Sequence, residues 1–531
     1  MMNSVISVIY FNYDSYLHNL YLGYGVSALK KVSPSVNVYF VSKNNLSEIS
    51  ETLDTRFIVA FLSMDFYSTF KNFCDAIGDR AVIIACHYTP TYLGKELLLD
   101  IPSVDYVILG EYDNTLPELL ACIMNNGSPL ECRGILLRKN GEIVHTGVRP
   151  HICNLDNLDF ADRDTIPHST NVFHLFASRG CESSCTFCDR NALYVGHEPK
   201  QRFRSIFNVV SEIDHLVSTY NCRFVTFSDA TFCSNINTVE RLMTLYQQLL
   251  TKKYWVQFFM NLRVEQINED VFNCLQQLKH VGLGRVFLGI ESFNLDDLKL
   301  YNKMSNYESN AKALQLINRY PQVTDDYMLD FEYGFILFNP YTSICELKNN
   351  INSLLVNAVP LTPNIISSRL VCDFYQPIAR KLDHDGLLTV PISNMTLDQK
   401  NSSDLKYRFL DETVGNIYEV LVSCYHILNI KLPGNVCFIR NRYYRFIGPD
   451  QRLSNLDNAY MEWKSNMSSF CENLVSTVIE QECQGTCSID KATRLCKDFK
   501  NSFEKTDRKL RMSEMRAFIE LQKIGEEVYE N

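Results

Sequence analysis

The chain has 531 residues, of which 46 % are hydrophobic and 21 % are charged. This composition is typical of globular proteins and excludes a disordered or fibrous chain. The formal net charge of −10, with no block of like charges, argues against a protein whose main partner is nucleic acid. No apolar stretch reaches the ~18 residues that a membrane span requires, and the first residues read as a strand rather than a signal peptide. We therefore expect a cytoplasmic protein with no membrane partner.

The first 150 residues alternate short apolar runs with helical patterns. Such alternation predicts a doubly wound parallel sheet, whose ligands lie outside the carboxyl ends of the strands. Helices are expected over residues 16–31 and 66–77. No G-x-G-x-x-G follows the first strand, so a dinucleotide site has little support. The expected strands cover residues 4–10, 36–41, 57–62, 81–86 and 105–109.

The same alternation resumes in the middle of the chain. Six strand–helix units predict a partial (β/α)6 barrel of the TIM type, with its chemistry at the carboxyl ends of the strands. One of its helices is expected to begin after Ser205 as N-cap. The expected strands cover residues 172–177, 223–228, 255–260, 285–290, 332–337 and 365–371.

The last part of the chain changes character. Residues 394–404 are polar and linker-like, and three long helical patterns follow at 413–427, 454–481 and 488–530. These patterns predict a mainly α-helical C-terminal domain. The fold class is therefore α/β, with a parallel sheet, a partial barrel and a helical domain in chain order.

One cluster stands out among the 19 cysteines. Cys181, Cys185 and Cys188 form a C-x3-C-x2-C pattern on a loop after the first barrel strand. Three thiolates can hold three irons of a [4Fe–4S] cluster and leave the fourth iron open to a small chelating molecule. Structural zinc, completed by His174 and His197, is one alternative, and inert buried cysteines are another.

This cysteine loop resembles the signature of the radical S-adenosylmethionine (SAM) superfamily, including the aromatic Phe187 before its last cysteine. The resemblance implies a [4Fe–4S] cluster on Cys181, Cys185 and Cys188, with SAM bound to the open iron. It also implies reductive cleavage of SAM to methionine and a 5′-deoxyadenosyl radical. The electron would come from a reductase, a flavodoxin or a ferredoxin.

The likeness is specific to the subgroup with an N-terminal cobalamin-binding (Rossmann-type) domain and covers about residues 1–390. Residues 104–119 resemble the last strand and helix of that domain, and residues 155–163 resemble the linker after it. Further barrel motifs are matched at 202–205, 227–232, 261–264 and 289–292. The implied division is a cobalamin-binding-like domain at 1–150, a linker at 151–168, a radical SAM barrel at 169–394 and a helical domain at 395–531.

Four cofactor-binding residues follow from the resemblance. Arg263 is expected to pair with the SAM carboxylate, because a guanidinium matches a carboxylate bidentately. Glu291 is expected at the ribose hydroxyls or the amino group of SAM, and Asp229 has a similar role. Ile336 is carried over for contact with the adenine. The alternatives are a packing arginine, an ion-paired structural acid and a turn residue, respectively, for the first three.

Two departures from the family pattern bear on the cofactors. The fifth-strand motif has Phe338 in place of its second glycine and lacks the glycine–glutamate pair. After the fourth N-terminal strand, where the family has a glycine pair, this chain has Ala85-Cys86-His87-Tyr88. Side chains there would crowd a flat corrin, since glycine allows the closest approach. His87 is expected either as a surface histidine or, with Cys86, as a contact to cobalt.

The C-terminal cysteines raise a separate question. An auxiliary iron–sulfur cluster on Cys471, Cys483, Cys487 and Cys496 is conceivable, and buried or solvent-facing thiols are the alternative.

The expected function is that of a radical SAM enzyme performing cobalamin-dependent C-methylation of an unactivated carbon in a natural-product or peptide substrate. One alternative is radical rearrangement, cyclisation or epimerisation without methyl transfer, with a vestigial cobalamin site. An alternative of another class is a non-catalytic iron–sulfur sensor or partner protein. No catalytic acid, base or hydrogen donor can be singled out from the sequence.

Overall fold

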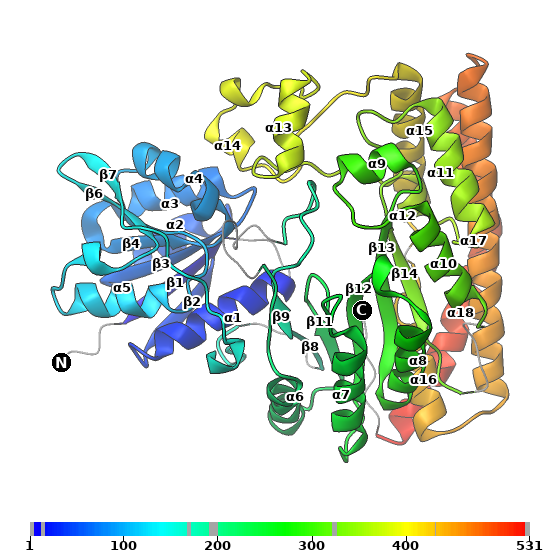
Figure 1. Cartoon of the computed structure of the whole chain (residues 1–531), viewed down its shortest axis with the longest axis horizontal. Helices are drawn as coiled ribbons and strands as arrows, with labels where there is room; N and C mark the ends of the chain where they lie inside the picture. The colour runs from blue at the N-terminus through cyan, green and yellow to red at the C-terminus, as the bar shows by residue number, and fades with distance from the viewer. Residues whose placement is uncertain are drawn as a thin grey trace.

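The computed structural model describes residues 5–11, 16–166, 171–190, 200–320, 326–430 and 432–525. Figure 1 shows three parts side by side: an N-terminal sheet with its helices, a central sheet, and long helices at the C-terminal side. None of the helices within these ranges is long and apolar enough to cross a membrane.

The N-terminal part is a seven-stranded sheet in the order β2-β1-β3-β4-β5-β6-β7. All five expected strands form, and they pair in parallel. Its strands are β1 Ile6–Phe11, β2 Val36–Phe40, β3 Phe57–Leu62, β4 Val82–Cys86, β5 Val104–Ile108, β6 Ile135–Lys139 and β7 Glu142–His145. Its helices are α1 Tyr16–Lys30, α2 Leu46–Thr52, α3 Tyr67–Ile77, α4 Tyr88–Asp100 and α5 Thr115–Met124. The antiparallel pair β6 and β7, which the sequence patterns above did not predict, extends the sheet at its β5 edge.

The central part is a five-stranded parallel sheet in the order β14-β13-β12-β11-β8. Its strands are β8 Val172–Leu175, β11 Phe224–Phe227, β12 Gln257–Arg263, β13 Leu283–Glu291 and β14 Asp330–Phe335. Its helices are α6 Ile206–Tyr220, α7 Thr238–Leu250, α8 Glu269–Leu278, α9 Leu295–Leu300, α10 Tyr307–Asn318 and α11 Ile344–Val356. The Ser205 side chain caps α6 as expected, accepting a hydrogen bond from the Asn208 amide.

The expected sixth barrel strand at 365–371 is much shorter in the structure. Helix α12, Pro363–Ile366, takes the first half of that range. The remaining pairing is a single parallel bridge between Phe338 and Arg369. The partial barrel therefore consists of five strands and one bridge in the described part of the chain.

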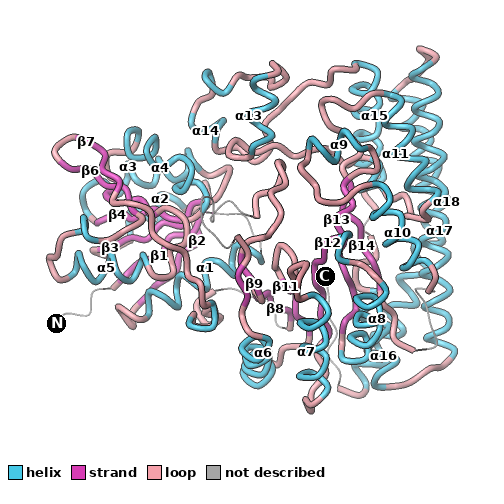
Figure 2. The backbone as a smooth tube through the Cα atoms, in the orientation of Figure 1, coloured by secondary structure: helices cyan, strands magenta, loops and turns pink. Residues whose placement is uncertain are grey.

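The C-terminal helices form as expected and share one hydrophobic core with the central sheet. They are α15 Glu412–Leu428, α16 Val436–Phe446, α17 Gln451–Cys483 and α18 Ile489–Lys523. The long pair α17 and α18 runs along the outer side of the molecule, as the tube view also shows (Figure 2). This part of the chain is held to the barrel by burial of apolar side chains rather than by a few polar contacts.

The polar segment at 394–404 is folded rather than linker-like. It contains α14, Leu397–Lys400, and follows α13, Pro377–His384; both lie above the gap between the N-terminal part and the barrel (Figure 1). The amide of Ser403 donates to the Asp65 carboxylate at 2.9 Å, and the amide of Ser68 donates to Asp398 at 3.0 Å. We call residues 397–403 the strap, because they tie the C-terminal side of the barrel to the N-terminal sheet.

A buried ion-pair network joins the N-terminal sheet to the entry of the barrel. Arg179, on the short strand β9 (Ser178–Arg179), donates to both carboxylate oxygens of Asp113 at 2.8 Å. Arg179 and Arg202 both reach Glu111, each at 2.9 Å. Glu111 and Asp113 follow β5, so the carboxyl end of the N-terminal sheet faces the first residues of the barrel.

Candidate functional site

The cysteine loop, residues 181–188, leaves the barrel directly after β9. Gly180 has a φ of +76°, which a residue with a side chain rarely adopts, and this turns the chain into the loop. The loop is anchored on the far side by Tyr301: its carbonyl accepts from the Thr186 amide at 3.0 Å, and its ring meets Phe187 edge-on at 5.3 Å. Phe187 thus holds the loop in place, which gives a packing reason for an aromatic residue before the last cysteine.

The three loop cysteines are withdrawn from solvent. Cys181 is buried, and Cys185 and Cys188 are half-buried. Burial raises the pKa of Cys185 to about 11 and the pKa of Cys188 to about 12, while the ammonium of Lys303 opposes the shift at Cys185. The thiols of Cys185 and Cys188 are therefore protonated at neutral pH and would release protons on binding a metal.

The described residues contain no three His, Cys, Asp or Glu side chains arranged around a single metal ion. A zinc ion needs all its ligands within ~2.3 Å, whereas a [4Fe–4S] cluster takes each thiolate on a different iron. His174 lies on β8 with its Nδ1 2.9 Å from Ser228 Oγ, and burial lowers its pKa to about 4. His197 is outside the described residues. The donor set fits the cluster better than it fits structural zinc.

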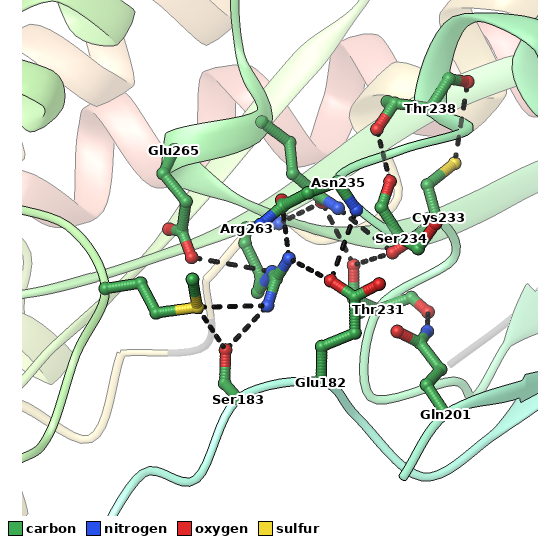
Figure 3. Close-up of polar contacts among 12 residues, drawn as sticks. Glu182, Ser183, Gln201, Thr231, Cys233, Ser234, Asn235, Thr238, Arg263 and Glu265 are labelled. Atoms are coloured by element: carbon green, nitrogen blue, oxygen red, sulfur yellow. Dashed lines mark hydrogen bonds and ion pairs between the residues drawn. The ribbon is translucent and has the colours of Figure 1, made fainter. Parts of the chain in front are cut away.

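Arg263 lies at the end of β12 and points at the cysteine loop (Figure 3). Its guanidinium donates to Ser183 Oγ at 2.6 Å and pairs with Glu182 at 3.0 Å, and both partners lie within the loop. Glu265 lies 3.5 Å away on its other side, and Asn235 accepts a further hydrogen bond. Arg263 is buried among polar groups, although none of the described residues accepts a hydrogen bond from its Nε. It is therefore neither a surface residue nor an apolar packing residue.

Glu291 ends β13 with a φ of +66°. Burial raises the pKa of its carboxyl, and the Lys303 ammonium, 3.7 Å from Oε1, opposes that shift. A Cβ at Gly289 would lie 2.4 Å from the Glu291 carboxylate, so the glycine of this motif makes room for the acid. A second close approach is at Gly334, where a Cβ would lie 2.7 Å from the Phe287 ring.

Asp229 and Ile336 lie behind the site rather than in its centre. The Asp229 carboxylate accepts hydrogen bonds from the Ala177 amide at 3.2 Å and from Ser178 Oγ at 2.5 Å. It therefore ties β11 to the segment that leads into the cysteine loop. Ile336 is buried beside Tyr301, and its amide donates to the Glu291 carbonyl at 2.8 Å.

Sequence reasoning missed the charged neighbours of the predicted residues. Lys303 follows α9 and reaches back to Glu291, while Glu182 and Glu265 flank Arg263. The position of Glu182 within the cysteine loop was a usable signal. The sequence carries no such signal for Lys303, because this residue does not end a strand. Only the folded path of the chain after α9 brings it to the site.

The end of β4 differs from the expectation of a surface histidine at His87. The residue is completely buried, with a backbone φ of +90° that favours glycine. Its ring packs against three tyrosine rings. The distances between ring centroids are 4.5 Å to Tyr88, 5.2 Å to Tyr21 and 6.1 Å to Tyr112. Expectation of a surface histidine was wrong. The backbone keeps a glycine-like path at this position, but an aromatic cluster fills the space beside it.

The C-terminal cysteines are distributed differently from the proposed auxiliary set. Cys483 is exposed and Cys487 is half-buried, whereas Cys471 and Cys496 are buried in the helical core. Cys424 forms a thiol hydrogen bond with Cys496. This distribution matches the alternative of buried or solvent-facing thiols.

Residues 175–331 match the family model described as the radical SAM superfamily. This match identifies residues 175–331 as a radical SAM domain. The matched segment runs from β8 into β14 and contains the cysteine loop, Arg263 and Glu291.

Three curated relatives illustrate the likeness of this chain to known proteins. It is 23 % identical over 236 residues to "Uncharacterized methyltransferase PH0819" from Pyrococcus horikoshii, covering 43 % of this chain and 50 % of the relative. It is 25 % identical over 249 residues to an anaerobic magnesium-protoporphyrin IX monomethyl ester cyclase from Rubrivivax gelatinosus, covering 44 % and 43 %. It is 25 % identical over 320 residues to 4′-phospho-dehydrooxetanocin synthase from Priestia megaterium, covering 56 % and 41 %. Each match spans half or less of the relative's length.

Solved structures match over more of the chain. The cobalamin-dependent radical SAM enzyme OxsB, with aqua-cobalamin and SAM bound, matches with a TM-score of 0.67 at 14 % identity, covering 97 % of this chain and 84 % of that one. The radical SAM methyltransferase TsrM from Kitasatospora setae, with cobalamin and a [4Fe–4S] cluster bound, matches with a TM-score of 0.57 at 11 % identity, covering 73 % and 76 %. These likenesses confirm the predicted fold class: an N-terminal parallel sheet, a partial barrel and C-terminal helices.

Proposed function

We propose that this protein is a radical SAM enzyme that cleaves SAM reductively at a [4Fe–4S] cluster held by Cys181, Cys185 and Cys188. The observation that carries the proposal is the position of these cysteines: a buried loop leaving the first barrel strand, inside the segment that matches the superfamily model. When bound, the cluster would supply the electron that splits SAM into methionine and a 5′-deoxyadenosyl radical.

The residues around the loop support SAM binding. Arg263 offers a buried guanidinium for the SAM carboxylate, and Lys303 adds a second positive charge beside Cys185. Glu291 is available for the amino group or the ribose hydroxyls, and Ile336 for the adenine. Asp229 would act indirectly, since its carboxylate holds the segment that enters the cysteine loop.

Cobalamin-dependent C-methylation of a small-molecule or peptide substrate is the reaction that the fold supports best. The carboxyl end of the N-terminal parallel sheet, where ligands of such sheets bind, faces the barrel entry through Glu111 and Asp113. The glycine-like backbone at His87 follows the path that a close corrin contact needs. Cobalamin, when bound there, would carry the methyl group for transfer.

A second candidate is radical rearrangement, cyclisation or epimerisation without methyl transfer. The observation that favours it is the buried His87 ring, which occupies space beside β4 together with Tyr21, Tyr88 and Tyr112. Both candidates require a reductant, because radical SAM enzymes depend on one. We propose a flavodoxin, a ferredoxin or a dedicated reductase as the donor.

Anaerobic reconstitution tests these proposals. The protein is incubated with iron, sulfide and hydroxocobalamin, desalted and analysed for iron, cobalt and 5′-deoxyadenosine released from SAM under reduction. Four irons per chain with release of 5′-deoxyadenosine support the enzyme. Cobalt at one per chain supports methyl transfer, whereas iron without cobalt supports the second candidate.

Two variants make the test specific. Cys181→Ala should lose iron and SAM cleavage while keeping whatever cobalt the wild type retains. Cys345→Ala is the matched control, because Cys345 is an exposed cysteine on α11. Absence of iron from folded wild-type protein would contradict the proposal, and iron without any SAM cleavage would point to a non-catalytic protein.

A further inference from the structure

A group of carboxylates lies next to the cysteine loop and is not used by the proposed chemistry. Its centre is Asp373, on the segment between the bridge at Arg369 and α13. The side chain is buried, with 9 % of the residue exposed. Its Oδ2 accepts hydrogen bonds from Tyr375 and from Gln376, each at 3.2 Å.

The other carboxylate oxygen of Asp373 has no such partner. Among the residues that the structure describes, none donates a hydrogen bond to Oδ1, although this atom is buried. A buried carboxylate oxygen without a donor is costly, and native proteins normally satisfy it. Oδ1 is therefore suited to accept a hydrogen bond from a donor that a ligand supplies.

The charges around Asp373 specify what kind of donor fits. Burial, together with the carboxylates of Asp189, Asp404 and Asp65, raises its pKa to about 7. Asp404 is itself paired with Arg369 and Lys406. A positive charge at Oδ1 would relieve this repulsion, whereas an anion would add to it.

An aromatic pair borders the same carboxylate. The rings of Tyr92, on α4, and Tyr375 stack with centroids 4.3 Å apart and planes inclined by 17°. Tyr375 also donates its hydroxyl hydrogen bond to Asp373. Tyrosine faces next to a carboxylate are a common environment for an ammonium group, because each ring attracts a cation through its quadrupole.

The position of these residues connects them with the chemistry. Asp189 directly follows Cys188, and its side chain is 48 % exposed. The Arg190 guanidinium lies 3.8 Å from its Oδ1, so this carboxylate is already partly compensated and Asp373 carries most of the proposed interaction. The segment of Asp373 is fixed to the cysteine loop by the Ile378 amide, which donates to the Thr186 carbonyl at 3.1 Å. A ligand held at Asp373 would therefore lie beside the loop that is proposed to generate the radical.

We propose that Asp373, with Asp189, Tyr92 and Tyr375, binds an ammonium group of the substrate, so that the enzyme acts on an amine-bearing, cationic compound. This proposal rests on the proposed function, since it names the substrate class of that same site. Asp373 would be the specificity-determining residue. Its Oδ1 accepts a hydrogen bond from the ammonium group, and the tyrosine rings flank the charge.

Binding of four small probes tests the proposal on the anaerobically reconstituted protein with SAM. Benzylamine is cationic, benzyl alcohol and benzamide are neutral, and benzoate is anionic, and all four carry the same ring. Ligand-observed NMR titration should give a dissociation constant for benzylamine at least tenfold below those of the other three. Equal binding of benzamide or benzyl alcohol, or preference for benzoate, would overturn the proposal.

Variants locate the effect. Asp373→Asn should weaken benzylamine at least tenfold and leave benzamide within twofold, because it removes the charge but keeps the shape. Asp189→Asn, at a half-exposed position, should weaken benzylamine about threefold, and it carries the test if Asp373→Asn does not fold. Asp296→Asn is the control, since Asp296 is 80 % exposed on α9. If the Asp373→Asn and Asp189→Asn variants both bind benzylamine as tightly as the wild type does, the proposal is wrong.

Iron content and release of 5′-deoxyadenosine are measured on the same wild-type sample. Normal iron and SAM cleavage without any preference for benzylamine would refute the amine site and leave the proposed function intact. Loss of iron or SAM cleavage in the wild type would refute the proposed function whatever the probes do.

Discussion

At the residue scale, the site is a set of charged side chains that already form ion pairs with one another. Arg263 is shared between Glu182 and Glu265, and Lys303 pairs with Glu291. A carboxylate that binds Arg263 must therefore compete with an acid of the protein. Glu182 is the partner that an incoming carboxylate can displace from Arg263, because its side chain is 31 % exposed and belongs to the cysteine loop.

This competition predicts opposite effects of two substitutions on SAM affinity. Glu182→Gln should strengthen SAM binding severalfold, because it removes the charge that competes for the guanidinium. Arg263→Lys should weaken it at least tenfold, because an ammonium cannot bind a carboxylate bidentately. Equilibrium dialysis of SAM against the iron-loaded protein measures both. If Glu182→Gln weakens binding as much as Arg263→Lys does, the acid is a ligand of SAM and not its competitor.

Asp229 predicts a specific pH dependence of stability. Burial raises the pKa of its carboxyl from 3.8 to about 6, against the hydrogen bonds from Ser178 and Ala177. The folded state therefore binds this proton more tightly than the unfolded state does. Ionised Asp229 destabilises the fold above pH 6, and that cost is relieved as the pH falls from about 6 towards 4.

Comparison with Asp229→Asn isolates this term, because all other titrating groups are common to both proteins. Between pH 7 and pH 5 the free energy of unfolding of the wild type should rise relative to the variant, by on the order of 1 kcal/mol. Urea unfolding at both pH values gives the difference. A constant difference would mean that Asp229 keeps an ordinary pKa in the folded protein.

The positions of site residues were predictable from sequence only where a strand end fixed them. Arg263 and Glu291 end adjacent parallel strands, β12 and β13, so their proximity follows from the alternation of strands and helices. The buried state of His87 does not follow, because an imidazole at a strand end is compatible with solvent, cobalt or an aromatic cluster. The rings around it come from α1, α4 and the segment after β5, which no local pattern connects.

At the scale of elements, apolar runs predicted the parallel strands of both sheets and missed the antiparallel pair β6 and β7. Strands β1 and β3 are buried along their whole length, and they were expected nearly as they occur. The hairpin of β6 and β7 was overlooked although Asn140 and Gly141 carry its signal. Both have positive φ, at 53° and 84°, as a two-residue hairpin turn requires.

The strap shows why a polar composition does not establish a linker. Its own residues are too polar for a core, but the strap is held by hydrogen bonds to the N-terminal part. Asp65 accepts from the Ser403 amide, Asp398 accepts from the Ser68 amide, and the Asp65 amide donates to the Asn401 carbonyl at 2.8 Å. Such pairings depend on how two distant segments meet, which a local reading of the chain does not contain.

The double variant Asp65→Ala, Asp398→Ala should release the strap without unfolding the domains. Each lost contact is a charge-assisted hydrogen bond, worth ~1–2 kcal/mol before solvent screening. Amide hydrogen exchange should therefore become at least tenfold faster at residues 65–68 and 397–403, and stay unchanged in β11 and β12. Asp296→Asn serves again as the control. Unchanged exchange at the strap would show that apolar packing of Leu397 against the N-terminal core, and not these carboxylates, holds it.

At the scale of the whole molecule, two kinds of interface join the three parts. The C-terminal helices and the barrel share a hydrophobic core, so they should unfold together. The N-terminal sheet has cores of its own and meets the barrel through the buried network of Arg179, Arg202, Glu111 and Asp113. Apolar contacts cross the same boundary, because Phe176, which follows β8, packs in the N-terminal core against Tyr21 and Tyr24. The network adds buried ion pairs to this apolar contact.

Removing Arg179 should uncouple these two parts. Arg179→Met leaves the carboxylate of Asp113 buried without its bidentate partner, and loss of one partner of a buried ion pair typically costs about 3–5 kcal/mol. We expect the calorimetric transition of the variant to split, with the N-terminal sheet unfolding at a lower temperature than the barrel and its helices.

Arg319→Met is the matched control, because the pair of Arg319 with Glu269 is exposed on both sides and should contribute little. The second variant Arg179→Met, Asp113→Asn should restore part of the lost stability, because the amide needs no countercharge. A single transition at the wild-type temperature in Arg179→Met would mean that the apolar contacts between α1 and β8, rather than the ion pairs, hold the N-terminal sheet on the barrel.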